Sequence, residues 1–129
     1  MTEPSFRYLA TEDLTILARA LLGDVLVVRD IGLLASAAAR PEASAFGRDA
    51  YPDLMSKAAA LLQSIVNNHP LVDGNKRLGW LSCAVFLDIN GVDPTVASND
   101  DVFDLVIWVA ATSVDVEAIA KRLESIVQR

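Results

Sequence analysis

The segment HPLVDGNKRLGW, residues 69–80, gathers most of the side chains in this 129-residue chain that could do chemistry. It holds the only histidine, His69, then Asp73, and then the adjacent cations Lys76 and Arg77. An imidazole can accept a proton near neutral pH, a carboxylate can hold a divalent cation, and two cations can neutralise phosphate. A base, a metal ligand and an anion site are the parts that phosphoryl or nucleotidyl transfer requires.

The elements on either side of this segment determine how it would work. Apolar residues at helical spacing predict a helix that ends before Pro70 and another that begins near Asn75. The free N–H groups of a helix start bind anions, Gly74 lets the backbone approach a ligand, and the Asn75 side chain adds an amide donor. The result is a phosphate cradle that differs from a Walker loop, because GxxxxGK[ST] is absent. Asp73 beside the cradle suits Mg²⁺, and His69 opposite it suits a general base.

Each of these residues also has a purely structural explanation. A lone histidine at a helix end is commonly a cap stabilised by the helix dipole, Asp-Gly-Asn is commonly a turn, and Lys-Arg is commonly solvated surface. For the segment to be inert, all three explanations must hold within nine residues. That coincidence favours a functional site.

The remainder of the chain predicts an all-α bundle of about six helices. Their expected starts are Thr11, Asp30, Pro52 (within the first turn), Asn75, Ser98 or Asn99, and Val114. The buried face expected for the helix after the turn is Leu78, Leu81, Val85 and Ile89. Residues 41–52, PEASAFGRDAYP, break the helical pattern and predict an exposed loop or a small hairpin.

Composition limits the possible functions. The chain is 53% hydrophobic and 22% charged, which predicts one globular domain over residues 1–129. A net charge of −6 argues against a protein that grips nucleic acid. The only cysteine, Cys83, lies in an apolar helical pattern and is expected to be buried and reduced. No apolar run is long enough for a bilayer, and residues 1–14 do not resemble a signal peptide, so we expect a cytoplasmic protein.

The segment HPLVDGNKR resembles the signature of the Fic-domain fold, H-P-F-x-x-G-N-G-R-x-x-R. It is more similar to the death-on-curing (Doc) branch of that fold, which reads roughly H-x-F-x-D-[AG]-N-K-R. The region before the signature and the stretch FLDINGV at 86–92 are similar as well. The resemblance therefore covers most of residues 29–92.

The resemblance implies a role for each matching residue. His69 would activate a hydroxyl of the target, and Asp73 would hold Mg²⁺. The set implied to bind the nucleotide phosphates is Gly74, Asn75, Lys76 and Arg77. The set implied to form a flap, which aligns the target protein by backbone pairing, is Phe46, Gly47 and Arg48.

Three positions depart from the Fic signature. Leu71 replaces a phenylalanine, which changes only packing. Lys76 replaces the second glycine, as in the Doc branch, and Trp80 replaces the terminal arginine. Lys76 fills space beside the phosphates, and Trp80 removes a cation that grips them. Both changes count against ordinary AMP transfer and favour an ATP turned round, with its γ-phosphate at the point of attack.

Taken with the resemblance, these residues predict a toxin of a toxin–antitoxin pair. It would use ATP and Mg²⁺ to phosphorylate a Ser or Thr of a protein, elongation factor Tu, and so arrest translation. Its partners would be an antitoxin and that substrate, with no direct binding of nucleic acid or membrane. The alternatives are a Fic-type protein AMP-transferase and a catalytically inactive helical module that only binds a partner.

Overall fold

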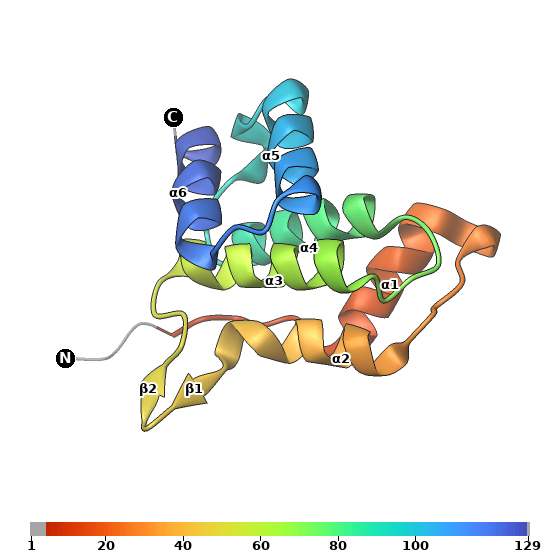
Figure 1. Ribbon diagram of the computed structural model, residues 1–129, viewed down its shortest axis with the longest axis horizontal. Coiled ribbons are helices and arrows are strands. Elements are labelled where there is room, and N and C mark those ends of the chain that lie inside the picture. The colour runs from red at the N-terminus through yellow and green to blue at the C-terminus, as the bar shows by residue number, and fades with distance from the viewer. Residues whose placement is uncertain (1–4, 129) are drawn as a thin grey trace.

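Six α-helices account for most of the chain in the computed structural model, which describes residues 5–128 (Figure 1). They are α1 (Thr11–Leu22), α2 (Ile31–Ala39), α3 (Leu54–Asn68), α4 (Asn75–Ile89), α5 (Asn99–Ala111) and α6 (Val116–Val127). Short 3-10 turns lie at Gly23–Val25, Arg40–Glu42 and Pro94–Val96. Within the described residues the only sheet is a hairpin of β1 (Ser44–Ala45) and β2 (Arg48–Asp49). The predicted all-α fold and the hairpin before α3 are confirmed.

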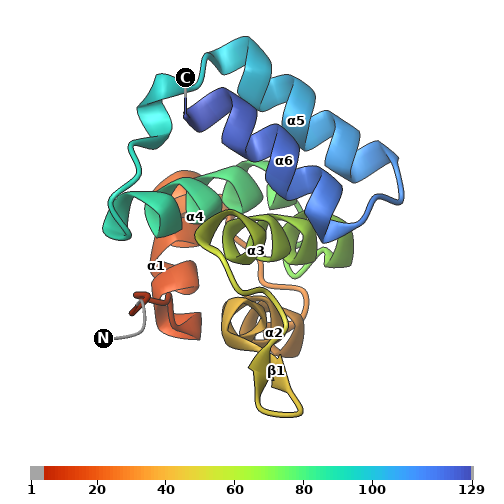
Figure 2. The same cartoon turned by 90° about the vertical axis from the view of Figure 1, so that its left-hand side faces the viewer.

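The helices form three layers (Figure 2). α3 and α4 lie side by side in the middle layer and make the most extensive helix–helix contact of the fold. α5 and α6 cover them on one side, and α1 and α2 cover them on the other, with α1 against α4 and α2 against α3. The 69–80 segment therefore joins the two central helices, and every layer packs against one of them.

Side-chain caps set several of the helix starts. Asp30, Ser98 and Asp115 each accept a hydrogen bond from a backbone N–H in the first turn of α2, α5 and α6. For α3 the cap is Asp53, whose carboxylate accepts from the Ser56 N–H at 2.8 Å, so the helix starts after Pro52. For α1 the expected start at Thr11 is confirmed, but Thr11 is not the N-cap: the N-cap is Ala10, whose N–H donates to the Asp13 carboxylate at 2.7 Å.

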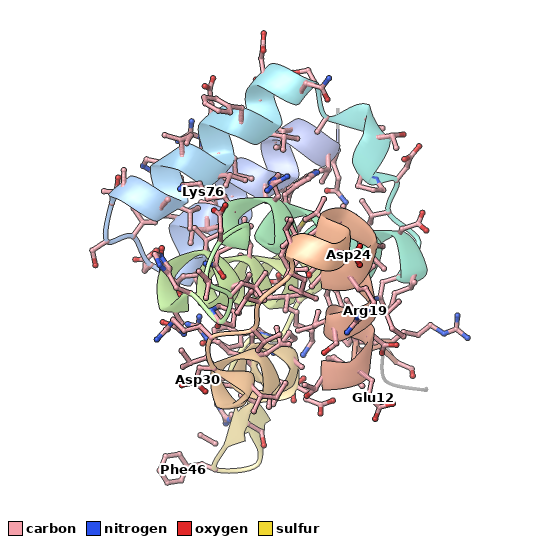
Figure 3. The ribbon with its side chains drawn as sticks, turned by 90° about the vertical axis from the view of Figure 1, so that its right-hand side faces the viewer. Glu12, Arg19, Asp24, Asp30, Phe46 and Lys76 are labelled. Carbon is pink, nitrogen blue, oxygen red and sulfur yellow. The ribbon has the colours of Figure 1, made fainter. Side chains whose placement is uncertain are left out.

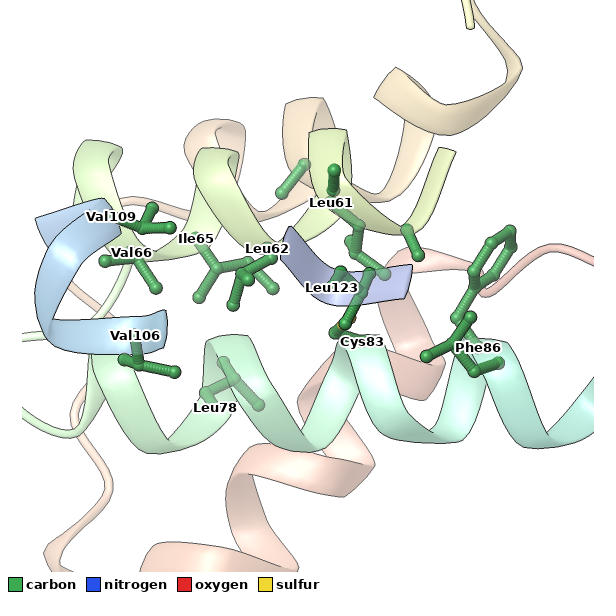
Figure 4. Close-up of a cluster of buried hydrophobic side chains, with 14 of the residues drawn as sticks. Leu61, Leu62, Ile65, Val66, Leu78, Cys83, Phe86, Val106, Val109 and Leu123 are labelled. Atoms are coloured by element: carbon green, nitrogen blue, oxygen red, sulfur yellow. The ribbon is translucent and has the colours of Figure 1, made fainter. Parts of the chain in front are cut away.

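The apolar core lies where α3 meets α4, α5 and α6 (Figure 4). α3 is buried along almost its whole length, as expected for the central helix. In α4 the predicted face is confirmed in part, because Val85 and Ile89 are partly buried and pack against the core. Of the four expected positions only Leu78 is fully buried, and the buried set is Asn75, Leu78, Gly79, Ser82, Cys83, Phe86 and Leu87. Burial raises the pKa of the Cys83 thiol to about 12, so the expected inert, structural cysteine is supported.

One unexpected charge lies inside the fold. The Lys57 side chain on α3 is fully buried, and its Nζ lies over the rings of Phe6 and Tyr8 at 4.9 and 5.5 Å. It donates to the Pro41 carbonyl at 3.0 Å and to the Asp49 carboxylate at 3.4 Å. Lys57 thus ties the N-terminal segment and the hairpin to the start of α3.

Within residues 5–128 no helix is both long and apolar enough to cross a membrane. The expected absence of a signal peptide rests partly on residues 1–4, which lie outside the described residues.

Gly79 allows α3 and α4 to approach closely. A Cβ at this position would lie 2.6 Å from Val66 Cγ2 and 3.3 Å from Leu62 Cδ1. We expect Gly79→Ala to lower the free energy of unfolding by about 1–3 kcal/mol, as overpacked cores do. Helix propensity alone predicts that the same substitution raises the free energy of unfolding by about 1 kcal/mol. The sign of the change, measured by urea denaturation, therefore shows whether packing or propensity dominates. In a Val66→Ala background the loss should shrink, and a gain in the native background would contradict this packing.

Candidate active site

The turn between α3 and α4 begins with a strained backbone. His69 is the C-cap of α3 and adopts the left-handed conformation, with φ 54° and ψ 63°. Such a conformation is uncommon for residues other than glycine and is kept where the surroundings impose it. Here Arg29 supplies the constraint, because its guanidinium donates to the carbonyls of His69 at 2.7 Å and Asn68 at 2.9 Å. Arg29 thereby pairs the end carbonyls of α3 and helps hold His69 in place.

Extended backbone from the α1–α2 connection supports the same turn. Val28 and Leu71 form an antiparallel bridge, and the Val72 N–H donates to the Val27 carbonyl at 3.0 Å. The Pro70 carbonyl accepts from the backbone N–H groups of both residues 29 and 30, at 2.8 and 3.0 Å. The apolar stretch at 25–28 and the two residues after it therefore support the turn through backbone hydrogen bonds.

Asn75 closes the turn from inside. Its side-chain oxygen accepts from the Leu71 N–H and its side-chain nitrogen donates to the Leu71 carbonyl, both at 2.9 Å, in a buried site. The expectation that this amide donates to a phosphate is therefore not supported, because the side chain is buried and both its oxygen and its nitrogen already bond the Leu71 backbone. Gly74 precedes it with φ 91°, and a Cβ there would lie 2.8 Å from Leu22 Cδ1. This position thus requires glycine for both its conformation and its space.

The start of α4 presents free donors. Within residues 5–128 the backbone N–H groups of Asn75, Lys76 and Arg77 make no hydrogen bond, as is usual in a first helical turn. The side chains of Lys76 and Arg77 are exposed and, within the same residues, make neither ion pairs nor hydrogen bonds. Free N–H groups, the positive end of the helix dipole and two cations therefore coincide, which makes this a strong anion site.

Asp73 stands next to these donors. It is exposed, and its Oδ1 accepts from the Gly74 N–H at 2.8 Å, which leaves Oδ2 available. No group of three or more His, Cys, Asp or Glu side chains that could hold a metal exists among residues 5–128. A closed cage of protein ligands is therefore not present there. A single carboxylate beside an anion site does fit Mg²⁺, which keeps several waters and is completed by phosphate oxygens.

One cavity of about 970 Å³ brings the predicted site residues together. Its polar end is formed by His69, Asp73, Gly74, Asn75, Lys76 and Arg77. All six residues assigned to base, metal and phosphate thus line the same space. Their chemical roles stay predictions, but their convergence is a property of the fold.

The other end of the cavity was not anticipated. Half-buried Trp80 and Leu81 line it from α4, and Val102, Phe103, Val106, Ile107, Ala110 and Ala111 line it from α5. Phe103 is 64% exposed and Ile107 is 39% exposed. Leu81, which was expected to lie on the buried face of α4, therefore lines the cavity instead. The helical spacing of the α5 residues marks an apolar face, but spacing alone does not tell a core face from a cavity wall.

The hairpin is remote from this cavity. Phe46 and Gly47 form its two-residue turn, both with positive φ, and the Phe46 side chain is fully exposed. The hairpin precedes α3 whereas His69 follows it, and the 15 residues of α3 span about 22 Å. Figure 3 shows Phe46 and Lys76 in different parts of the molecule. Target docking by Phe46, Gly47 and Arg48 stays a prediction, and a docked segment would have to run along the molecule to reach His69.

Comparisons with known proteins agree with this architecture. The sequence model of the Fic/DOC family matches residues 8–87, which include α1 through most of α4 and the whole 69–80 segment. A protein of Mycolicibacterium smegmatis named Toxin Doc is 49% identical over 119 residues, which cover 90% of this chain and 90% of that protein. The similarity therefore extends past the site into the helices that surround it.

The structural role of Asn75 can be separated from ligand binding. Asn75→Ala leaves the buried N–H and carbonyl of Leu71 without partners, so we expect the free energy of unfolding to fall by about 2–4 kcal/mol. Asn75→Asp keeps the acceptor and should cost less. Asn99→Ala, which removes the other asparagine of the cavity, should leave stability unchanged because the Asn99 side chain makes no hydrogen bond among the described residues. Urea denaturation measures all three, and full stability of Asn75→Ala would contradict the structural role.

Proposed function

Because the chain belongs to the Fic/Doc family, we propose that it is a toxin of a toxin–antitoxin pair that transfers the γ-phosphate of ATP to a Ser or Thr hydroxyl of a protein. The observation that carries the proposal is the single cavity shared by His69, Asp73, Lys76, Arg77 and the free N–H groups of α4. The similar protein named Toxin Doc supports the toxin role. We propose elongation factor Tu as the target. The protein would then act in the cytoplasm and arrest translation.

In this proposal the side chains of the turn divide the work. The N–H groups of the first turn of α4, with Lys76 and Arg77, hold the terminal phosphate and offset its charge. The target hydroxyl gives its proton to a nitrogen of the His69 ring as its oxygen bonds to the γ-phosphorus. The bond from that phosphorus to the bridging oxygen breaks, and ADP leaves. Mg²⁺ held by Asp73 would neutralise charge on the phosphate oxygens when bound.

Two alternatives are weaker on specific grounds. AMP transfer requires the α-phosphate at the anion site, and Lys76 and Trp80 stand where the Fic signature has a glycine and a phosphate-binding arginine. An inactive binding module has no use for exposed, unpaired cations beside an exposed histidine and aspartate in one cavity. We therefore place kinase chemistry first and AMP transfer second.

The reaction can be assigned with labelled ATP. We expect label from the γ-phosphate, and none from the α-phosphate, to appear on a protein when the native chain is incubated with purified elongation factor Tu, Mg²⁺ and ATP. Phosphorimaging of the separated proteins measures both labels in parallel reactions. Transfer from the α-phosphate would overturn the kinase assignment, and Lys76→Gly should then raise it. If the γ-phosphate label appears on other proteins of a cell extract and not on elongation factor Tu, the kinase assignment stands and the proposed target is refuted.

The role of His69 can be tested in growing cells. We expect strong expression of the native chain to stop growth and His69→Asn to restore it, because loss of a general base typically slows a reaction by about 10²–10⁴-fold. Asparagine tolerates the left-handed backbone of this position, so the fold should survive. Colony counts measure toxicity, and thermal melts of the purified proteins provide the control.

Asp73→Ala should also restore growth, because it removes the proposed Mg²⁺ ligand. The fold should survive, since the Asp73 side chain bonds only the adjacent Gly74 N–H. Normal growth under abundant soluble native protein would refute the toxin role. Undiminished toxicity of a folded His69→Asn variant would refute the base.

A further inference from the structure

A second, smaller cavity of about 470 Å³ lies between α2 and α3 and takes no part in the chemistry proposed above. α2 lies along α3 and runs in the opposite direction (Figure 1), so this α2–α3 pocket extends along α3 as far as Asn68, the residue before His69. Its lining residues are Ser36, Ala39, Arg40, Ala43, Ser64 and Asn68.

The Arg40 guanidinium is the charged group in this pocket. Its Nε donates to the Tyr51 hydroxyl at 3.0 Å, and its central carbon lies 5.3 Å from the centre of the Tyr51 ring. Its Nη1 donates to Ser64 Oγ at 3.0 Å and to the Ala60 carbonyl at 3.2 Å. These partners fix the orientation of the guanidinium, but none of them is a carboxylate.

The charge of Arg40 has no counter-ion among residues 5–128, and its Nη2 makes no hydrogen bond there. The side chain is half-buried, and a charge withdrawn from water is usually paired with an opposite charge. The Ser36 hydroxyl and the Asn68 side-chain amide, both on exposed residues, also make no hydrogen bond in that range. A fixed guanidinium with a free N–H edge, next to two neutral hydrogen-bonding groups, is matched to a carboxylate.

We propose that the α2–α3 pocket binds an Asp or Glu side chain of the protein that the chain phosphorylates, so that Arg40 determines specificity for the substrate. The inference rests on the proposed function, and it adds the chemistry of one substrate residue. The occupant is a protein segment because the pocket extends to Asn68, and a segment with its hydroxyl beside His69 continues past that residue.

Helix geometry gives the spacing between the two substrate residues. Arg40 bonds to Ala60 and Ser64 of α3, which lie about 8–14 Å from His69 along the helix axis at about 1.5 Å per residue. An extended segment advances about 3.3 Å per residue, so the acidic residue is expected about two to four positions from the Ser or Thr that accepts the phosphate.

The sites of modification test this expectation. Proteins of a cell extract that accept the γ-phosphate of ATP from the native chain are identified, and the modified Ser or Thr is mapped by mass spectrometry. We expect an Asp or Glu about two to four positions away. Replacing that acid by its amide in the purified substrate should lower kcat/KM about 10-fold through a higher KM, the lower end of what a hydrogen bond between charged groups provides. The same change at a distant acid of the same substrate should leave both constants unchanged.

Two matched variants of the enzyme provide the control. Ser36→Asp places a carboxylate one helical turn before Arg40, where it occupies the guanidinium in place of the substrate. Ala35→Asp adds the same charge at a neighbouring exposed position of α2 outside the pocket. We expect Ser36→Asp to abolish the difference between acid and amide substrates and Ala35→Asp to keep it, with the KM for ATP unchanged in both. Arg40 itself is left in place, because its replacement would also break its bonds to Tyr51 and to the Ala60 carbonyl.

The possible failures are distinct. Modified sites without a nearby acid, equal kcat/KM for acid and amide substrates, or equal effects of Ser36→Asp and Ala35→Asp would overturn the carboxylate pocket and leave the proposed kinase function standing. If the folded native chain transfers the γ-phosphate to no protein, the proposed function and this inference are overturned together.

Discussion

Two hydrogen bonds between the Asn75 side chain and the Leu71 backbone hold together the turn on which the functional site depends. They tie the first residue of α4 to the loop that leaves α3, and the start of α4 and the histidine that ends α3 line the same cavity. Arg29 supports the same turn from outside through the carbonyls of Asn68 and His69. A site built this way is formed before any ligand arrives, and preorganised donors need little rearrangement as charge develops in a reaction.

The rest of the fold holds this turn in place. α3 and α4 lie close together because Gly79 leaves no side chain between them, and the outer layers bury both helices. Beside the turn that joins them, a polar half and an apolar half form one cavity. In the proposed function the polar half would carry out phosphate transfer.

Helices were predictable because their apolar residues recur with a helical period, and the turn was predictable because its polar residues stand out between two such patterns. The family resemblance then predicted a role for each of those residues. Contacts between distant segments were not predictable: nothing in the sequence around Arg29 indicates that it binds the end of α3. Asn75 was misjudged because an amide near a phosphate site looks like a donor to the ligand, whereas the fold uses it on Leu71. On the predicted face of α4 only Leu81 was misplaced: it lines a cavity, and apolar spacing does not distinguish a cavity wall from a core face.

The central claim is that the first turn of α4 is a preformed phosphate site beside His69. The most direct measurement is a titration of the isotope-labelled native chain with Mg²⁺ and ATP, followed by the NMR signals of the backbone amides. The account predicts that the largest shifts occur at the N–H groups of Asn75, Lys76 and Arg77, with the His69 ring also affected. Saturable binding that shifts amides elsewhere and leaves those three unchanged would contradict it.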